Sequence, residues 1–303
     1  MFHTKENTMT IENSTSLLKV NVIRRNGEKA PLDITKIRNV IQNSTKGLDA
    51  DALKLEASLE AKLIEGVKTK DIQDNLIESS LKMCNLQEPD WRYVAGRLEI
   101  WSLIKDVRVS RSFGYGDYYK SVCYQIENNR YSEDILIYTR EELEEAGTWI
   151  NTELDWDYDY AGAAKLLSRY LLKDELIQEA FLTCALLIAR VEKFDRRLEI
   201  AKEIYEAIAK RKISLATPIL ANLRKPNGSL SSCFIISSGD SLESIFNQIT
   251  NTAKISKAGG GIGVNLSNVR AAGSYVMSRA NSSGGVIPWI KLFNDTAIAV
   301  NQG

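Results

Sequence analysis

Cys233 has the sequence context of a thiol that could take part in redox chemistry. It lies in SSCFII (231–236), at the start of an apolar run, and the neighbouring serines could bind a polar substrate through hydroxyls and amides. A free cysteine is more often a small buried hydrophobic residue. A redox role requires a second thiol at a Cα–Cα distance of about 6 Å. The remaining cysteines all fall in regions expected to be helical: Cys84, Cys123 and Cys184.

A second group of residues could bind phosphate. Arg24-Arg25-Asn26-Gly27 places two guanidinium groups beside a tight turn, and such fork-shaped donors match the oxygens of a triphosphate. Lys36, Lys68 and Lys105 could add positive charge if the helices that carry them converge there. A solvated basic turn is the alternative interpretation, because exposed arginine and lysine are the norm.

Two further segments could offer backbone N–H groups to an anion. In Asp240-Ser241-Leu242-Glu243, an N-cap aspartate followed three residues later by glutamate is a capping-box pattern, and a helix N-terminus can also bind phosphate. The glycine run AGGGIG (258–263) permits close approach to a ligand, or only a sharp loop. It lacks the Gly-Lys-Ser/Thr of a Walker loop. Arg270 and Arg279 downstream could reach an anion or lie on the surface.

The elements expected to position the basic turn are a β-hairpin and four helices. LLKVNVIRRNGEKAPLDI (17–34) is apolar on both sides of Asn26-Gly27, a dipeptide suited to a tight turn with positive φ at both central positions. In the helices that follow, Thr35 is the expected N-cap of the first and Thr69 of the third, and Pro89-Asp90 opens the fourth. This pattern predicts a compact first domain.

The rest of the chain changes from helical to mixed patterning. FLTCALLIARV (181–191) predicts a buried helix that contains Cys184, whereas the acidic and aromatic NTELDWDYDY (151–160) is interpreted as a surface turn region without chemistry. After Thr217-Pro218, short β-type runs alternate with helical patterns, which favours an α/β region. So small an α/β layer cannot bury both faces of its strands, and we expect the missing surface to come from elsewhere.

Composition limits the function classes. The 39 Lys and Arg residues balance 39 Asp and Glu residues, so nothing indicates a nucleic-acid partner. A single histidine, His3, and the absence of a C-x-x-C pair argue against a metal site. Scattered cysteines fit a reduced cytoplasm, and no apolar run approaches the roughly 20 residues that cross a membrane. The polar start predicts a disordered leader over residues 1–17.

Taken in order, these segments resemble the N-terminal part of the large, catalytic subunit of class I ribonucleoside-diphosphate reductase. The resemblance covers about Leu18 to Gly303 and rests on VIRRNGEKAPLDITKI, GVKTKDI, PDWRYVAGRLEIW, KISLATPILANLR, SLSSCFI, GDSLESI, AGGGIGVNLSNVRAAGS and NQG. It implies an α/β fold class with three parts: an ATP-cone of a β-hairpin and four helices over 18–108, a helical reductase domain over 109–215, and the first part of a ten-stranded α/β barrel over 216–303, incomplete in this chain.

The resemblance also implies roles for individual residues. The contacts to ATP or dATP in the activity site are Arg24, Arg25, Asn26, Gly27, Lys36, Thr69 and Lys105. Gln73 departs from the pattern, because family members that respond to dATP often carry histidine there. The specificity-effector residues are Asp240, Ser241, Leu242, Lys257, Arg270 and Arg279. Thr217, Ser232 and Gly261 match substrate contacts, and Cys233 matches one of two redox cysteines that reduce the ribose and then form a disulfide.

The family's thiyl-radical cysteine, the Asn and Glu beside it, the second redox cysteine, the radical-transfer tyrosines and the C-terminal cysteine pair have no counterpart in these residues. We therefore expect a naturally split large subunit, inactive alone, with a second polypeptide completing the barrel. The alternatives are a stand-alone regulatory module that binds ATP or dATP, a truncation of a longer chain, and part of an adenosylcobalamin-dependent reductase.

The resemblance implies further cofactors and partners for the split subunit. They are dNTP effectors, a thioredoxin- or glutaredoxin-type reductant and a radical from a di-iron small subunit. Large subunits are expected to dimerise in the cytoplasm, with no metal, nucleic acid or membrane bound by this chain.

Overall fold

The computed structural model describes residues 20–59 and 63–300. The predicted leader over residues 1–17 and the final NQG lie outside the described residues. The chain forms two compact units: the first comprises residues up to Ser214 together with Arg224–Pro226, and the second comprises Leu215–Leu223 and the residues from Asn227 onward.

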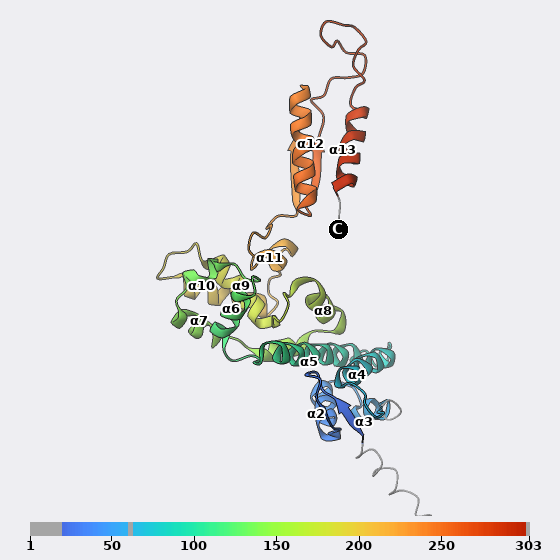
Figure 1. Ribbon diagram of the computed structural model, residues 1–303, viewed down its shortest axis with the longest axis vertical. Helices are drawn as coiled ribbons and strands as arrows, with labels where there is room; N and C mark the ends of the chain where they lie inside the picture. Colours follow the sequence, from blue (N-terminus) through green and yellow to red (C-terminus); the bar gives the residue numbers. More distant parts are fainter. Residues whose placement is uncertain (1–19, 60–62, 301–303) are drawn as a thin grey trace, which may run out of the picture. The chain divides into compact units, whose positions relative to one another are not determined.

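The N-terminal part of the first unit is a β-hairpin packed on four helices (Figure 1). The elements are β1 (Asn21–Ile23), β2 (Lys29–Pro31), α2 (Ile34–Thr45), α3 (Ala52–Ala57), α4 (Thr69–Met83) and α5 (Trp91–Arg111). The strands pair antiparallel, with Val22 opposite Ala30. Val22, Ile41 and Leu55 enter one apolar core with Leu76, Trp91, Val94 and Leu98. The predicted hairpin and four helices are confirmed within the described residues.

The hairpin turn differs from the sequence expectation. Gly27 has φ +86°, whereas Asn26 is not among the residues with positive φ. The Gly27 N–H donates to the Arg24 carbonyl at 2.9 Å, and the Arg24 N–H donates to the Glu28 carbonyl at 2.8 Å. This is a three-residue loop closed by a left-handed glycine. The Asn26 side chain accepts the Glu28 N–H at 3.2 Å and stabilises this turn.

Two predicted helix caps are wrong by one or two residues. The N-cap of α2 is Asp33, whose carboxylate accepts the Thr35 N–H, so Thr35 is already inside the helix. Helix α4 starts at Thr69, and its N-cap Lys68 makes no side-chain capping bond. Aspartate outranks threonine as a cap, which explains the first shift. Helix α5 follows its N-cap Asp90, as Pro89-Asp90 predicted.

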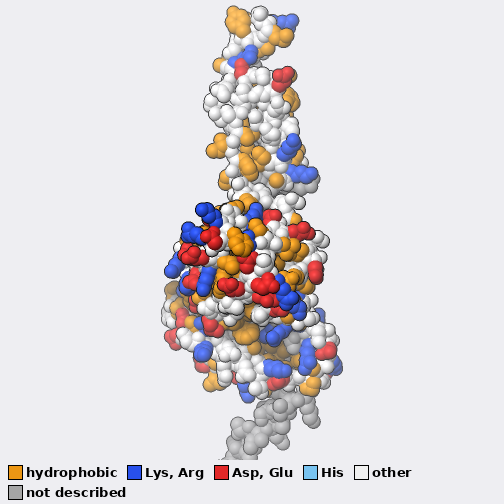
Figure 2. Space-filling model, turned by 90° about the vertical axis from the view of Figure 1, so that its left-hand side faces the viewer, with side chains coloured by type: hydrophobic (Ala, Val, Ile, Leu, Met, Phe, Trp, Pro, Cys, Tyr) orange, Lys and Arg blue, Asp and Glu red, His pale blue; other side chains and the backbone are white. Residues whose placement is uncertain are grey.

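The rest of the first unit is helical. Its elements are α6 (Tyr118–Glu127), η3 (Glu133–Ile137), α7 (Arg140–Gly147), η4 (Thr152–Asp157), α8 (Tyr160–Lys165), η5 (Leu166–Tyr170), α9 (Ile177–Ala189) and α10 (Arg197–Ala209). Helix α9 is the buried helix predicted around Cys184, and it packs on α10. The face of this unit in Figure 2 mixes Lys and Arg with Asp and Glu, without an extended basic surface.

The interpretation of residues 151–160 as a surface turn region is wrong for η4 and its residue Asp155. Asp155 in η4 is fully buried and accepts hydrogen bonds from the Tyr115 hydroxyl at 2.6 Å and from Gln178 Nε2 at 2.7 Å. Burial raises the pKa of Asp155 to about 6 despite these two bonds. A polar side chain can be buried where its partners satisfy it, and these partners come from distant parts of the sequence.

The second unit is a strand–helix–strand arrangement with one further helix after it. It contains α11 (Thr217–Asn222), β3 (Cys233–Ser237), α12 (Leu242–Lys257), β4 (Gly261–Asn265) and α13 (Ile287–Val300). Strands β3 and β4 pair in parallel, with Cys233 opposite Gly261. Helices α12 and α13 lie side by side (Figure 1), and Phe246 meets Trp289 edge to face.

The predicted α/β character and the incomplete barrel are confirmed in this unit. The described residues of this unit contain one two-stranded parallel sheet and no closed barrel. Ile235 on β3 is 90% exposed, so one strand face has no cover of its own. Within the part of the chain that the structure describes, no helix combines the length and apolar character needed to cross a membrane.

Candidate nucleotide-binding site

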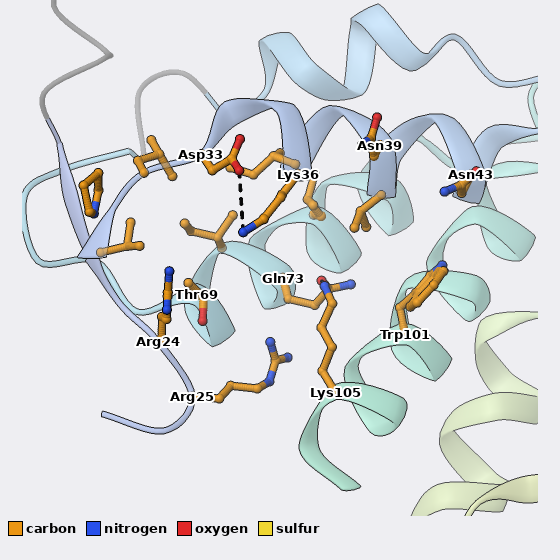
Figure 3. Close-up of a pocket in the computed structure, with 17 residues that line it drawn as sticks. Arg24, Arg25, Asp33, Lys36, Asn39, Asn43, Thr69, Gln73, Trp101 and Lys105 are labelled. Atoms are coloured by element: carbon orange, nitrogen blue, oxygen red, sulfur yellow. Dashed lines mark hydrogen bonds and ion pairs between the residues drawn. The ribbon is translucent and has the colours of Figure 1, made fainter. Parts of the chain in front are cut away.

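The N-terminal part of the first unit contains a cavity of about 580 Å³ between the hairpin, α2, α4 and α5 (Figure 3). Its polar wall is formed by Arg24, Arg25, Asp33, Lys36, Asn39, Asn43, Thr69, Gln73 and Lys105. Its apolar wall includes Val22, Leu32, Ile37, Val40, Ile72, Leu76 and Trp101. A volume of this size, with polar groups converging on an apolar bed, suits a small organic ligand.

Arg25 is the most firmly fixed cation of this cavity. Its side chain is only 10% exposed, and Nε lies 2.6 Å from Asp106 Oδ1. Its Nη2 donates to Ser102 Oγ at 2.9 Å. Both partners belong to α5, so the guanidinium is held in place before any ligand arrives. Arg24 is half exposed and pairs with Glu28 at 3.5 Å.

Lys105 supplies a second, partly buried cation. Its Nζ donates to Gln73 Oε1 at 2.9 Å, and Gln73 Nε2 donates to the Leu98 carbonyl at 2.8 Å. Burial and the positive charge of Arg25 lower the pKa of Lys105 to about 8, against a smaller opposite effect of Asp106. An anion in the cavity would favour the charged form of this lysine.

One helical face of α2 lines the other side of the cavity. Lys36 Nζ lies 3.6 Å from Asp33 Oδ2, and its side chain remains 74% exposed. Asn39 and Asn43 follow on successive turns and also line the cavity (Figure 3). The sequence alone did not identify Asn39, Asn43 and Trp101 as binding residues. The spacing of 36, 39 and 43 was a usable signal, but a polar stripe on a helix usually faces solvent.

Five of the seven residues expected at the activity site line this one cavity: Arg24, Arg25, Lys36, Thr69 and Lys105. Asn26 and Gly27 do not line it. Gly27 instead borders a second cavity of about 520 Å³, which shares Arg24 and Arg25 and adds Lys68 and Lys70.

The expected effector residues of the second unit are only partly gathered. Asp240 accepts the Arg270 N–H at 2.8 Å and pairs with Arg270 Nε at 2.6 Å. The bond from this backbone N–H is the main cause of a lowered Asp240 pKa. The prediction that Asp240 caps the helix is wrong: the N-cap of α12 is Ser241, whose side chain accepts the Ser244 N–H.

Of the other effector residues, Leu242 follows closely after Asp240, whereas Lys257 and Arg279 lie farther along the chain. Leu242 is exposed at the start of α12, and Lys257 is the last residue of the same helix. Arg279 lies in an exposed turn, where it bridges with Val276.

Cys233 is exposed at the first position of β3, opposite Gly261 on β4. The Gly261 N–H donates to the Ser232 carbonyl at 2.7 Å, and Ser232 Oγ lies 3.8 Å from Cys233 Sγ. Thus Ser232, Cys233 and Gly261 are brought together, whereas Thr217 is the first residue of α11. The four cysteines are free thiols. The described residues hold no cluster of three His, Cys, Asp or Glu side chains suited to a metal ion.

Comparison with known families assigns three consecutive segments of the chain. An ATP cone domain matches residues 20–106, a ribonucleotide reductase all-alpha domain matches 157–228, and a ribonucleotide reductase barrel domain matches 231–303. The cavity described above therefore lies in the segment that matches a cone, upstream of two reductase segments. This order defines the class: the N-terminal part of a ribonucleotide reductase large subunit.

Relatives with curated names agree. The chain is 60% identical over 285 residues to the ribonucleoside-diphosphate reductase subunit alpha of Synechocystis, covering 94% of this chain and 37% of the relative. The Helicobacter pylori alpha subunit is 37% identical over 294 residues, covering 93% and 36%. The Escherichia coli alpha subunit is 29% identical over 297 residues, covering 93% and 38%. The chain belongs to the ribonucleotide reductase alpha-subunit family and spans little more than a third of these relatives.

Proposed function

We propose that the 580 Å³ cavity binds ATP or dATP and that the chain supplies the regulatory and first catalytic parts of a ribonucleoside-diphosphate reductase. The observation that carries this proposal is the convergence of Arg24, Arg25, Thr69 and Lys105 on one cavity, within the segment that matches an ATP cone.

The geometry suggests which residues would contact the phosphates of the ligand and which would contact its sugar and base. Arg25, fixed by Asp106 and Ser102, offers a preorganised guanidinium to the phosphates. Helix α4 begins at Thr69 without a side-chain cap, so no capping side chain competes with phosphate oxygens for the N–H groups of its first turn. Lys105 adds a point charge beside them. Leu32, Ile37 and Val40 provide an apolar bed for the sugar and base.

Replacing Lys105 by methionine tests this assignment. Because a hydrogen bond to a charged group contributes about 1.5–3 kcal/mol, Lys105→Met should raise the ATP dissociation constant about 10- to 100-fold. Isothermal titration of ATP into the full chain measures this. Lys82→Met is the matched control, because Lys82 is exposed, pairs with Glu78 of the same helix and does not line the cavity. Unchanged affinity in Lys105→Met would remove the cavity as the nucleotide site.

The lowered pKa of Lys105 predicts a pH dependence of binding. The free cavity holds Lys105 with a pKa of about 8, and bound phosphate raises that pKa, so binding takes up a proton above pH 8. Affinity should be steady below pH 8 and should fall as pH rises above it, by at most about tenfold per pH unit. Titration of ATP at pH 7, 8 and 9 measures this. The decline should disappear in Lys105→Met, and a wild-type affinity that is flat to pH 9 would contradict the role.

We propose that Cys233 is one of the two redox cysteines of the reductase. In the proposed reaction two thiols lose two electrons and two protons and form a disulfide. The C2′–O bond of the ribonucleoside diphosphate breaks, the hydroxyl leaves as water, and a C2′–H bond takes its place. A radical from a di-iron small subunit would start the reaction, and a thioredoxin- or glutaredoxin-type protein would reduce the disulfide. The exposed Cys233, with Ser232 and Gly261 beside it, supports this assignment. Four free thiols suit a reducing cytoplasm.

We also propose that a second polypeptide completes the barrel and that two large subunits pair through the second unit. The exposed Ile235 on β3 supports the first point, because a parallel sheet is normally covered on both faces. The effector residues support the second. Asp240 and Lys257 lie at opposite ends of α12, about 24 Å apart by helix rise. One effector can contact an Asp240 and a Lys257 together if one of these two residues comes from a second copy of the chain.

A further inference from the structure

Trp101 contacts two parts of the first unit. It lines the nucleotide cavity at the end near Asn43 (Figure 3). It also stacks on Trp156 of η4, with ring centroids 5.1 Å apart and an angle of 30° between the planes. Offset stacking of two indoles is a favourable and directional contact. The position of Trp101 in the cavity wall therefore depends on the position of Trp156.

Arg97 connects the same segment to another wall of the cavity. Its Nε donates to the Trp156 carbonyl at 3.0 Å, and its Nη1 donates to the Lys46 carbonyl at 2.7 Å, just beyond the end of α2. Helix α2 carries Asn39 and Asn43 into the cavity. The backbone of η4 thus contacts Arg97, and the same arginine also binds the backbone at the end of α2. Gly96 permits this closeness, because a Cβ there would overlap the Tyr158 carbonyl oxygen.

The residue before Trp156 joins the buried polar network of the helical part. Asp155 accepts from Gln178 Nε2 of α9, and the Tyr205 hydroxyl of α10 donates to Gln178 Oε1 at 3.0 Å. The network is closed to water, and all of its members are hydrogen-bonded. A shift of η4 would disturb these bonds, so η4 is held between the cavity wall and the core of the helical part.

We propose that Trp156 is a positioning residue for the nucleotide cavity, and that Asp155-Trp156 couples occupancy of the cavity to the buried polar network of α9 and α10. The proposal rests on nucleotide binding as the function of the cavity. A ligand that packs against Trp101 favours one position of the indole pair and therefore of η4. Coupling of this kind is reciprocal, so changes in η4 must alter nucleotide affinity in turn.

Amide hydrogen exchange of the full chain, with and without ATP, tests the coupling. ATP should slow exchange in the hairpin, residues 21–31, and also in residues 151–158, which do not line the cavity. If ATP slows the hairpin but leaves 151–158 unchanged, the coupling is wrong and nucleotide binding stands. If neither region changes and titration shows no binding, the proposed function fails and this inference fails with it.

Substitution of Trp156 gives the second test. Trp156→Leu should raise the ATP dissociation constant about three- to tenfold, the range expected for loss of an aromatic pair. Trp156→Phe should restore affinity to within about twofold of wild type, because it keeps a stacking ring. Trp149→Leu is the matched control, since Trp149 belongs to the same helical part and contacts Lys202 instead. Titration stoichiometry separates weaker binding from loss of folded protein, and wild-type affinity in Trp156→Leu would overturn the proposal.

Discussion

Cys233→Ser is expected to abolish dithiol-dependent turnover in a reconstituted reductase while leaving ATP binding intact. A serine hydroxyl cannot form the disulfide that balances the two electrons delivered to the ribose. The loss should therefore be complete within detection rather than partial. The cavity of the ATP cone belongs to the first unit and Cys233 to the second, so ATP affinity should stay within about twofold of wild type.

The measurement requires the remainder of the barrel. The chain would be mixed with a polypeptide carrying the part of the Synechocystis relative beyond the matched region, a small radical-generating subunit and a thioredoxin-type reductant. Cys123→Ser is the matched control, because Cys123 is a partly buried thiol on α6 of the first unit. Turnover by Cys233→Ser would show that the thiol is structural. No turnover by the wild-type mixture would contradict completion of the barrel by a second polypeptide.

The parts of the fold that sequence predicts best are those with local causes. Asn26-Gly27 and the apolar alternation around it predict the hairpin, and Gly27 does take the left-handed conformation. The apolar run around Cys184 predicts α9, and CFIIS and GIGVNL predict β3 and β4. In each case the residues that decide the element lie within it, so a short window of sequence contains the cause.

The errors have causes that lie far away in sequence. The capping pattern at 240–243 placed Asp240 at the N-cap, but Arg270 binds that carboxylate and Ser241 takes the cap. Asp155 looked like a solvated acid because its partners come from other segments: Tyr115 lies in the turn between α5 and α6, and Gln178 lies in α9. No local pattern distinguishes such a residue from a surface one.

The residues of the candidate site also differ in whether local sequence or distant packing identifies them. Arg24, Arg25 and Lys105 attract attention because clustered cations suit phosphate. Asn39, Asn43 and Trp101 become cavity residues only after α2 and α5 pack against each other. Sequence therefore locates the end of the cavity that we propose to bind phosphate, whereas the residues at the opposite end are found only from the structure.

Arg224→Met is expected to lower the free energy of unfolding by about 3–5 kcal/mol, because it leaves a buried charge without its partner. Arg224 and Glu175 are both fully buried, with Nε 2.6 Å from Oε1 and Nη2 donating to Oε2 at 3.0 Å. Arg224 Nη1 also donates to Cys184 Sγ at 2.9 Å. This pair anchors residues 224–226 to the first unit. Urea unfolding, followed by far-ultraviolet circular dichroism, measures the loss.

A surface ion pair of similar geometry provides the control. Arg140 Nε lies 2.7 Å from Glu144 Oε1, but both side chains are exposed, so Arg140→Met should cost less than about 1 kcal/mol. The double variant Arg224→Met/Glu175→Gln should be more stable than Arg224→Met, because it removes the charge that the single variant leaves unpaired. The oxygen of the neutral amide can still accept the Leu172 N–H, and its NH2 group can donate to the Tyr131 hydroxyl oxygen. If the double variant were less stable than Arg224→Met, packing of the arginine, rather than its charge, would account for the loss.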